Sequence, residues 1–446
     1  MNRPVWRLPL CVAVSAVFAS PCYAELTVLP GEIYENYEYL DIETVLNNGG
    51  EFTNFAGISL ISSYDSVTGV FNQAELINTG AFNNVGYGIG LYQGSVLNNS
   101  GTFNSEDLYL GTGSVANNSG EYTNYISVSG DNTGVFNNSG TFNNSAYANI
   151  SGLDKFNNSG TLNNYGEIDI GDSQVFNNYS SGVINNYSSI NVSINGTIDN
   201  ADHINNFNRV ELHGTINNNT GEINNTSEIS GSGIINNSRM SVLINEQLIT
   251  GLSGLNSSGL VTNNGSIQTD NMQVSGLLNG SGDITTTNGL VITEAGTLAP
   301  GDWLDSIYNP FAGEIDIYGD LILNGTLEIE FDYYGINDVV NVNGNVALGE
   351  NSVLDVFFLS DSYVNNWVLG ETYDVMFADS ITGGFSEFFY YESTEGDLAL
   401  DWLIIEDFAG RDILRIEVVS AVPLPAAFWL FLSGLVGLIS IRRRIK

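Results

Sequence analysis

The segment Val135–Asn144 has the sequence VFNNSGTFNN, and Lys155–Asn164 repeats it as KFNNSGTLNN. A third copy follows, so that Phe136, Phe156 and Phe176 are spaced by 20 residues. A repeat this short is typical of a solenoid, in which each turn contacts only its neighbours. It is not typical of a chain of globular modules.

Each repeat contains two strands of the form apolar-Asn-Asn and a third apolar strand such as Glu167–Ile170. Three short strands in 20 residues predict an all-β, right-handed parallel β-helix. Because side chains alternate along a strand, Phe136 and Asn138 share one face, and Val135 and Asn137 share the other. With Phe136 inside, Asn138 also points into the core. Equivalent asparagines of successive turns can then satisfy each other's amide groups.

We expect the asparagine-rich β-solenoid to cover residues 25–299. It has room for ~12 turns between Leu46 and Thr293, at the ~4.8 Å spacing of stacked strands. Stacked turns bury a continuous core, but their ends need caps. Glu25–Val45, which is rich in acidic residues and tyrosine, is the candidate N-terminal cap.

The segment 300–420 predicts an acidic end of the β-helix. It holds 24 of the 50 acidic residues, and its asparagine pairs fade. Alternating apolar and polar residues continue through Tyr373–Ala378, and two further strands, Leu400–Ile405 and Ile413–Val419, predict a capping β-layer. The order from Gly296 to Ala378 resembles the last turns of autotransporter passenger β-helices. That resemblance implies the fold and surface exposure, and because only a short tail follows, we do not expect autotransport.

Residues 1–24 have the pattern of a secretory signal peptide: two arginines, an apolar run and a short polar end. We expect cleavage between Ala24 and Glu25. The alternative is a lipoprotein signal at Cys22, to which Pro21 is a poor fit. Both cysteines lie in this segment, so the processed chain would have no disulfide, thiolate metal site or cysteine nucleophile.

Residues 421–446 form a tail of three parts. They are the motif Val422-Pro423-Leu424-Pro425-Ala426, an apolar segment that ends at Ile441, and the basic cluster Arg442-Arg443-Arg444. The apolar part would be a transmembrane helix of about 24 Å, at ~1.5 Å per residue, which is short for a ~30 Å bilayer core. The arginines would keep the C-terminus in the cytoplasm.

This order of parts resembles the PEP-CTERM family of bacterial sorting signals, in its VPLPA variant. Leu424 replaces the glutamate of the commoner pattern. The resemblance implies a Gram-negative bacterium that makes exopolysaccharide, and an exosortase, a membrane transpeptidase, that cuts near the proline motif. The protein would be anchored transiently in the inner membrane and then released or attached at the cell surface. The alternative is a plain single-span anchor.

The charge of the chain excludes one class of partner. The formal net charge is −39, and between Glu25 and Ala421 five basic residues face all 50 acids, giving −45. Such a surface repels phosphate backbones, so nucleic-acid binding is not expected.

An enzyme is the alternative function. β-Helices host polysaccharide lyases and glycosidases, and glycosidases need two carboxylates across a cleft. The densest acidic series is Asp199, Asp202 and Glu211, with His203 beside it. Acids on a polar solenoid face are usually only solvated, and His203 and His213 are expected to be solvated too. No nucleophile elbow, phosphate loop or zinc motif is present, so no catalytic residue, metal or cofactor is predicted.

The sequence therefore predicts an exported surface or matrix β-solenoid with a structural or adhesive role. Its rows of Asn, Ser, Thr and Tyr would bind exopolysaccharide or neighbouring cells. The alternatives are a carbohydrate-active enzyme and, with less support because Thr-x-Thr rows are absent, an ice-binding protein.

Overall fold

The computed structural model describes residues 25–65, 70–301, 313–331, 336–358, 368–390 and 398–420. The predicted signal peptide and the sorting tail lie outside these residues. The chain divides into two compact units, which we call unit 1 (residues up to 278, with 282–291) and unit 2 (279–281 and from 292 onwards). Every regular element in the described ranges is a strand. Those ranges accordingly contain no helix that is long and apolar enough to cross a membrane.

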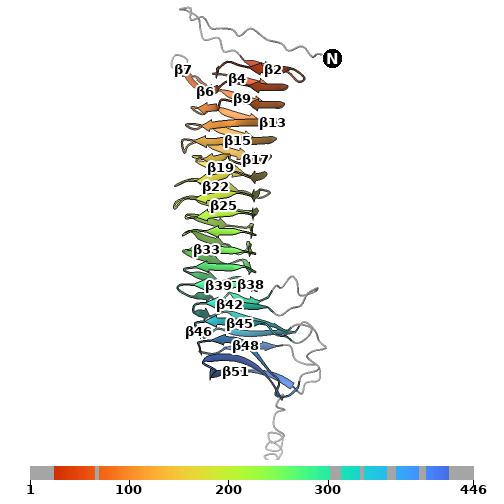
Figure 1. The fold of residues 1–446 in the computed structure, drawn as a ribbon, viewed down its shortest axis with the longest axis vertical. Coiled ribbons are helices and arrows are strands. Elements are labelled where there is room, and N and C mark those ends of the chain that lie inside the picture. Colours follow the sequence, from red (N-terminus) through yellow and green to blue (C-terminus); the bar gives the residue numbers. More distant parts are fainter. Residues whose placement is uncertain are drawn as a thin grey trace, which may run out of the picture. The chain divides into compact units, whose positions relative to one another are not determined.

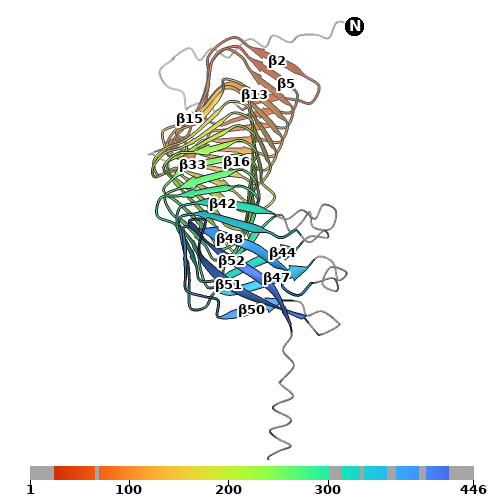
Figure 2. The same cartoon turned by 60° about the horizontal axis from the view of Figure 1, so that its bottom comes forward.

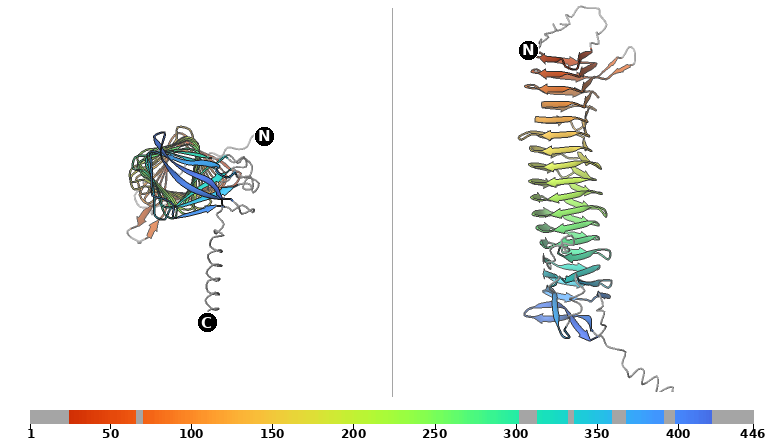
Figure 3. Two further views of the ribbon diagram at one scale, coloured as in Figure 1. Left: turned by 90° about the horizontal axis from the view of Figure 1, so that it is seen from below. Right: turned by 90° about the vertical axis from the view of Figure 1, so that its right-hand side faces the viewer.

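Unit 1 is a parallel β-solenoid, which confirms the predicted fold class; the solenoid has about 13 turns. Its strands stack in sequence order (Figure 1), and the view along the axis shows each turn closing around the core (Figure 3). Each turn has three strands, which form three faces of the solenoid. We call them face 1, face 2 and face 3 in the order in which the chain passes through them.

The strands of face 1 are β1 (Leu26–Val28), β4 (Val45–Asn48), β9 (Glu75–Asn78), β12 (Val96–Asn99), β14 (Val115–Asn118), β16 (Val135–Asn138), β19 (Lys155–Asn158), β22 (Val175–Asn178), β25 (Thr197–Asn200), β28 (Thr215–Asn218), β31 (Ile234–Asn237), β34 (Gly254–Ser257) and β37 (Met272–Val274). Face 2 consists of β2 (Ile33–Asn36), β5 (Glu51–Asn54), β10 (Ala81–Asn84), the first parts of β13 (Thr102–Leu110) and β15 (Glu121–Gly130), β17 (Thr141–Asn144), β20 (Thr161–Asn164), β23 (Val183–Asn186), β26 (His203–Asn206), β29 (Glu222–Asn225), β32 (Val242–Asn245) and β35 (Leu260–Asn263).

Face 3 consists of β3 (Leu40–Ile42), β6 (Ile58–Ile61), β11 (Ile89–Tyr92), the second parts of β13 and β15, β18 (Asn149–Ser151), β21 (Glu167–Ile170), β24 (Ser189–Val192), β27 (Arg209–Leu212), β30 (Glu228–Ser230), β33 (Leu248–Leu252), β36 (Ser266–Thr269) and β39 (Asp283–Thr286). A short antiparallel hairpin, β7 (Ser63–Asp65) and β8 (Val70–Asn72), interrupts the second turn. The strands β38 (Leu277–Gly280) and β40 (Leu290–Ile292) contain the points of division between the units.

The register of face 1 is the one that the 20-residue period predicts. Phe136 pairs with Phe156, and Phe156 with Phe176, in successive parallel strands. Their rings stack with centroids 5.1 and 4.7 Å apart, and all three are almost fully buried. Stacked aromatic rings therefore form part of a dry core, in which large apolar side chains contribute most of the stabilisation.

The prediction that the second asparagine of each pair points inward is also confirmed. On face 1, the inner amides form an unbroken chain of hydrogen bonds of 2.7–2.8 Å from Asn48 to Asn237, one turn to the next. A second chain runs along face 2 from Asn124 to Asn263 at 2.7–2.9 Å. Buried amides are tolerated here because each finds its partner in the equivalent residue of the next turn.

The Ser-Gly pair after many face 1 strands has a steric cause. A Cβ atom at Gly140 would lie 2.1 Å from the backbone oxygen of Gly120 in the preceding turn, and Gly160 meets Gly140 in the same way. Glycine is required because the stacked corners between face 1 and face 2, called corner 1 below, approach each other through their backbones.

The candidate N-terminal cap is built like the other turns of the solenoid. Glu25–Val45 holds β1, β2 and β3, which pair in parallel with β4, β5 and β6. Leu26 aligns with Leu46. The segment is therefore a regular turn of the solenoid. Its strands lack the asparagine pair, which is why the repeat pattern does not reveal it.

Unit 2 contains three parallel ladders. The first ladder consists of β43 (Leu321–Leu323), β46 (Asn345–Leu348) and β49 (Ser380–Thr382). The second consists of β41 (Thr297–Pro300), β44 (Thr326–Phe331), β47 (Val353–Phe358) and β50 (Glu387–Tyr390). The third consists of β42 (Glu314–Tyr318), β45 (Val339–Asn343) and β48 (Thr372–Ala378). The apolar residues that alternate along them, such as Leu327 and Ile329, are fully buried.

The parallel ladder of β48 ends in antiparallel strands. β52 (Arg411–Ser420) pairs with β48 on one side and with β51 (Leu398–Phe408) on the other, as Figure 2 shows. These two strands contain the predicted segments Leu400–Ile405 and Ile413–Val419. Across the β48–β52 pair, the Arg415 guanidinium donates to both carboxylate oxygens of Asp374, at 2.5 and 3.0 Å. This bidentate pair fixes the register of the antiparallel strands.

Candidate functional site

The acidic residues that the sequence nominates for catalysis lie on different parts of unit 1. Asp199 belongs to β25 on face 1, where its carboxylate accepts a hydrogen bond from the Asn217 amide at 2.8 Å. Asp202 lies at corner 1, and Glu211 belongs to β27 on face 3. The fold therefore does not bring the three carboxylates into the single cleft that glycoside hydrolysis requires.

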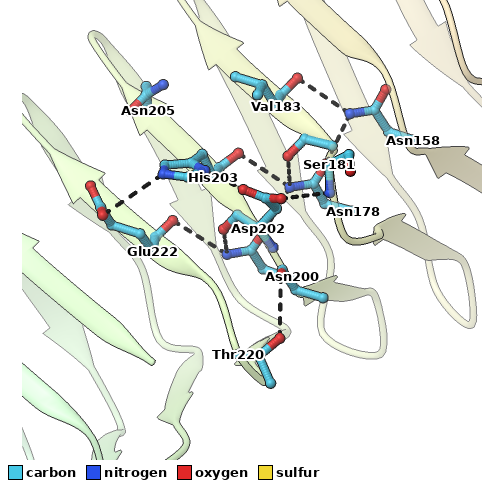
Figure 4. A network of polar contacts seen from close by, with 12 residues as sticks. Asn158, Asn178, Ser181, Val183, Asn200, Asp202, His203, Asn205, Thr220 and Glu222 are labelled. Atoms are coloured by element: carbon cyan, nitrogen blue, oxygen red, sulfur yellow. Dashed lines mark hydrogen bonds and ion pairs between the residues drawn. The ribbon is translucent and has the colours of Figure 1, made fainter. Parts of the chain in front are cut away.

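Asp202 and His203 belong to a surface network that also includes Glu222 of the next turn (Figure 4). Asp202 contacts the Nδ1 atom of His203, and its other carboxylate oxygen accepts from the Ser181 backbone N–H at 2.5 Å. The Oε2 atom of Glu222 lies 3.9 Å from Nε2 of His203. Half of the His203 side chain is exposed. The network ties corner 1 to face 2, and ion pairs this exposed contribute little to stability.

Glu211 has its own partners on face 3. Its carboxylate lies 3.0 Å from Nη2 of Arg209 and 3.2 Å from Nε2 of His213. Because all three side chains are more than a third exposed, this is a solvated cluster of paired charges.

The most regular polar feature of the solenoid surface is a row of outward carboxamides on face 1. The first asparagine of each pair points outward, and from Asn98 to Asn177 each amide Nδ2 donates to Oδ1 of the preceding turn, at 2.7–2.8 Å. Asp199 interrupts this chain because a carboxylate has no proton to donate, and a second run follows from Asp199 to Asn256 at 2.8–3.1 Å.

Each outward amide keeps unused hydrogen-bonding capacity. A carboxamide has two N–H donors and two acceptor sites on its oxygen, and the row uses one of each. One donor and one acceptor per amide are left for other partners, except at Asn157, whose oxygen also accepts from the Tyr179 hydroxyl at 3.4 Å. They repeat at the spacing of the stacked strands, ~4.8 Å.

Two shallow grooves run along corner 1 beside this row. The first has a volume of about 260 Å³, and its walls include Asn137, Asn157, Ser139 and Ser159, with Tyr179 among the lining residues. The second, of about 310 Å³, is lined by Asn236, Asn256, Gln273 and neighbouring serines. Both are open, and asparagine, glutamine and serine side chains line them beside apolar surface, so they offer a hydroxyl-rich polymer both hydrogen-bonding groups and apolar contact.

Tyr179 is a groove residue that sequence reasoning did not single out. It occupies the place of Ser139 and Ser159 in the third copy of the repeat, which reads VFNNYSSG. Its hydroxyl lies 3.4 Å from Oδ1 of Asn157, and about half of the residue is exposed. The break in the Asn-Asn-Ser pattern is the signal by which it could have been found.

In unit 2, four carboxyl groups gather around β44. Asp338 is buried, and its two oxygens accept from the backbone N–H groups of Gly313 and Glu330 at 2.7 and 2.8 Å. Burial raises the pKa of Asp338 to about 8. Burial, with the nearby charges of Glu330 and Asp355, raises the pKa of Glu328 to about 7. These groups hold protons near neutral pH, which limits their use as cation ligands.

The described residues contain no group of three or more histidine, cysteine or acidic side chains placed to hold a metal ion. Of the predicted cleavage pair, Ala24 lies outside the described residues. The Glu25 carboxylate accepts hydrogen bonds from the Thr27 hydroxyl and the Asn47 amide. The sorting motif Val422–Ala426 and the cluster Arg442–Arg444 also lie outside the described part of the chain. No protein-family model and no curated protein matches this sequence.

Proposed function

We propose that this protein is an exported β-solenoid of the bacterial cell surface or extracellular matrix, with a structural or adhesive role based on polysaccharide binding. The observation that carries the proposal is the outward carboxamide row of face 1 with its grooves, because most of its amides keep a free donor and a free acceptor. A polysaccharide chain presents hydroxyl groups at similarly regular intervals. Many weak contacts along such a row add up to avidity.

Export and sorting complete the proposal. Residues 1–24 would direct secretion, and the tail from Val422 onwards would hold the protein transiently in the inner membrane of a Gram-negative cell. An exosortase would then remove the tail. We take the coil to be right-handed, as parallel β connections almost always are. We also infer that the antiparallel strands β51 and β52 act as a C-terminal cap that blocks open-ended strand pairing.

C-terminal peptide mapping by mass spectrometry tests the sorting part. Surface and medium fractions should contain protein that ends near Pro425 and lacks residues 428–446. Intact tail confined to the inner-membrane fraction would contradict sorting. The protein would then be a tethered periplasmic rod.

Co-sedimentation with polysaccharide from the producing cells tests the binding part. We compare the wild type with a variant that carries Asn117→Asp, Asn137→Asp and Asn157→Asp. These changes keep the shape of the row but remove its donors and add three negative charges. Weaker binding of the variant, with unchanged circular dichroism, supports the row as a binding surface. Absence of polysaccharide binding by the wild type would contradict the adhesive role.

The carbohydrate-active enzyme receives no specific support. Asp199, Asp202 and Glu211 lie on different parts of the solenoid, and each has a partner of its own in the described structure.

A further inference from the structure

A second, different row of side chains follows the corner between face 2 and face 3, called corner 2 below. Tyr165, Tyr187 and Phe207 are the residues that follow β20, β23 and β26 in three successive turns. Neighbouring rings lie with centroids 4.9 and 5.0 Å apart and interplanar angles of 6° and 10°. Despite this stacking, the three residues remain 49, 41 and 45% exposed.

A row of partly exposed amides accompanies the rings, with one amide in each of the same three turns. Asn163, Asn185 and Asn205 precede the three aromatic residues by two positions, and their amides are joined one turn to the next at 3.0 Å. The chain bends at each of the three aromatic residues, directly after its strand ends. Each ring still keeps the register of the turns, since the backbone N–H of Tyr165, Tyr187 and Phe207 donates to the preceding turn at 2.8–2.9 Å.

The fold does not require aromatic residues at this corner. The corresponding position after other face 2 strands is occupied by Val85, Glu106, Ser145 and Thr226, although Tyr37, Phe55 and Tyr125 occupy it in three further turns. Three exposed aromatic residues in consecutive turns leave a contiguous apolar strip in water, which a protein surface usually avoids unless the strip binds something.

We propose that these six residues, the aromatic–amide strip, form a binding site for one chain of a neutral polysaccharide with flat pyranose rings. A pyranose ring has an apolar face of C–H groups, which packs on aromatic rings, and a rim of hydroxyl groups, which suits carboxamides. The strip offers both at the ~4.8 Å repeat of the turns. This inference rests on the proposed polysaccharide-binding role and assigns that role a second site and a ligand class.

Charge selects a neutral chain over an acidic one. None of the six side chains is charged, and the span from Glu25 to Ala421 carries −45. The nearest cation along the chain, Arg209, is paired with Glu211 at 3.0 Å. Glu167, which follows Tyr165 by two residues, is an acid near the strip, and its carboxylate accepts a hydrogen bond from the Asn191 amide at 2.7 Å. An acidic polysaccharide would meet net repulsion and no free cation at the strip.

The size of the strip favours a glycan over a protein partner. A stable protein interface buries ~800 Å² on each side, which three aromatic and three asparagine side chains do not supply. A single polymer chain needs only a narrow contact.

Affinity electrophoresis tests the inference. The full chain, as the producing cells make it, is run in native gels that contain hydroxyethyl cellulose, galactomannan or soluble β-1,3-glucan as neutral polysaccharides, or alginate as the acidic one. The test variant is Tyr165→Ala/Tyr187→Ala. The matched control is Tyr87→Ala/Tyr147→Ala, which removes two exposed tyrosines from other turns of corner 2, outside the stacked row, 67 and 101% exposed. A third variant, Asn185→Asp, charges the middle of the amide row.

We expect at least one neutral polysaccharide to retard the wild type and the control. The dissociation constant should rise about tenfold or more in Tyr165→Ala/Tyr187→Ala, as truncation of aromatic anchors commonly does, and it should also rise in Asn185→Asp. If the wild type and the double variant are retarded equally, the strip is not the site, while the proposed polysaccharide binding stands. Retardation by alginate alone overturns the neutral ligand class. If no gel retards the wild type and the double variant instead loses self-association in sedimentation, the strip is a protein contact.

Discussion

Asn137 and Asn138 are neighbours in β16, yet their side-chain amides donate in opposite directions along the solenoid axis. The Nδ2 atom of Asn138 donates to Oδ1 of Asn158 in the following turn at 2.8 Å. The Nδ2 atom of Asn137 donates to Oδ1 of Asn117 in the preceding turn, also at 2.8 Å. The inner and outer amide rows of face 1 are thus antiparallel chains of dipoles. The two rows have opposing dipole fields. The solenoid of unit 1 therefore gains these hydrogen bonds without a large net dipole along its axis from the side chains.

The two residues should differ sharply in their contribution to stability. Asn138 is buried, and its amide also donates to the backbone oxygens of Gly140 and Thr161 at 3.2 and 3.1 Å. Asn138→Ala breaks the buried hydrogen bonds to the amides of both adjoining turns, Asn118 and Asn158, and leaves the Asn158 side-chain oxygen without the Asn138 donor. We expect the free energy of unfolding to fall by about 2–3 kcal/mol.

The matched substitution Asn137→Ala, one residue away and partly exposed, should cost no more than about 0.5 kcal/mol, since water replaces the lost partner. Urea titration followed by circular dichroism measures both variants. Equal losses would show that the inner row is no more important to the fold than the outer one.

Tyr122 is an imperfection in the core whose removal should stabilise the protein. It aligns with Phe103 and Phe142 in the adjoining turns, is fully buried, and stacks on both rings. Its hydroxyl makes no hydrogen bond of ordinary distance and angle within the described structure, although it lies near the Ser105 hydroxyl, which donates to the Asp107 backbone oxygen at 2.9 Å. Burial raises the pKa of the Tyr122 phenol well above its usual value.

Tyr122→Phe removes a desolvated polar atom and keeps the ring. We expect the free energy of unfolding to rise by about 1 kcal/mol, measured by the same urea titration. Phe142→Tyr, which adds a buried hydroxyl one turn away, is the converse control and should destabilise. A loss of stability in Tyr122→Phe would mean that the hydroxyl has a partner, such as a bound water.

Two glycines of unit 1 should respond to alanine in opposite ways. A Cβ atom at Gly140 would lie 2.1 Å from the Gly120 oxygen, and this backbone atom cannot rotate away. Gly140→Ala should therefore cost about 3 kcal/mol. Gly254, in β34, has no atom within 4 Å of its Cβ position. Gly254→Ala should stabilise the strand slightly, by about 0.5 kcal/mol, because alanine loses less entropy on folding. The pair can be compared by thermal unfolding, and similar melting temperatures would contradict the close backbone stacking at corner 1.

The sequence was sufficient to predict which residues of one repeat lie in the core. It was not sufficient to predict which surface residues of successive turns line up along the solenoid axis. The 20-residue spacing of Phe136 and Phe156, with alternation along each strand, placed both phenylalanines and the second asparagines in the core. The alignment of turns further along depends on their individual lengths, which are 22 residues from Phe176 to Ile198 and 18 from Ile198 to Ile216. Rows such as Tyr165–Tyr187–Phe207 therefore become visible only when the register is known.

The acid cluster of unit 2 was hidden for a related reason. Glu328 and Asp355 are far apart in sequence and become neighbours through the pairing of β44 with β47. That their carboxyl groups are desolvated is a property of the packed structure, which alternation in the sequence does not reveal. The same holds for Asp338, whose two backbone partners come from separate segments.

This cluster should make unit 2 less stable as the pH rises. The carboxyl groups of Glu328 and Asp338 have pKa values raised to about 7 and about 8 in the folded protein, from ordinary values of 4.5 and 3.8. At a pH between the ordinary and the raised pKa of each group, the folded state binds more protons than the unfolded chain. The free energy of unfolding therefore falls with rising pH. The stabilisation is complete below pH 4 and is lost as the pH passes through 7 and 8.

Glu328→Gln should weaken the dependence of stability on pH, because a glutamine amide cannot ionise. Loss of the Glu328 charge also removes its repulsion with Glu330 and Asp355. At pH 8.5 the variant should unfold at a higher urea concentration than the wild type, and at pH 5 the two should be nearly equal. Thr326→Val, on the same strand and without a change of charge, should keep the full pH dependence of the wild type. Intrinsic tryptophan fluorescence follows unit 2 selectively, since four of the five tryptophans, Trp402 of β51 among them, belong to unit 2, and Trp6 lies in the predicted signal peptide. A wild-type midpoint that stays constant or rises between pH 5 and 8.5 would show that these carboxyl groups are already ionised in the folded protein.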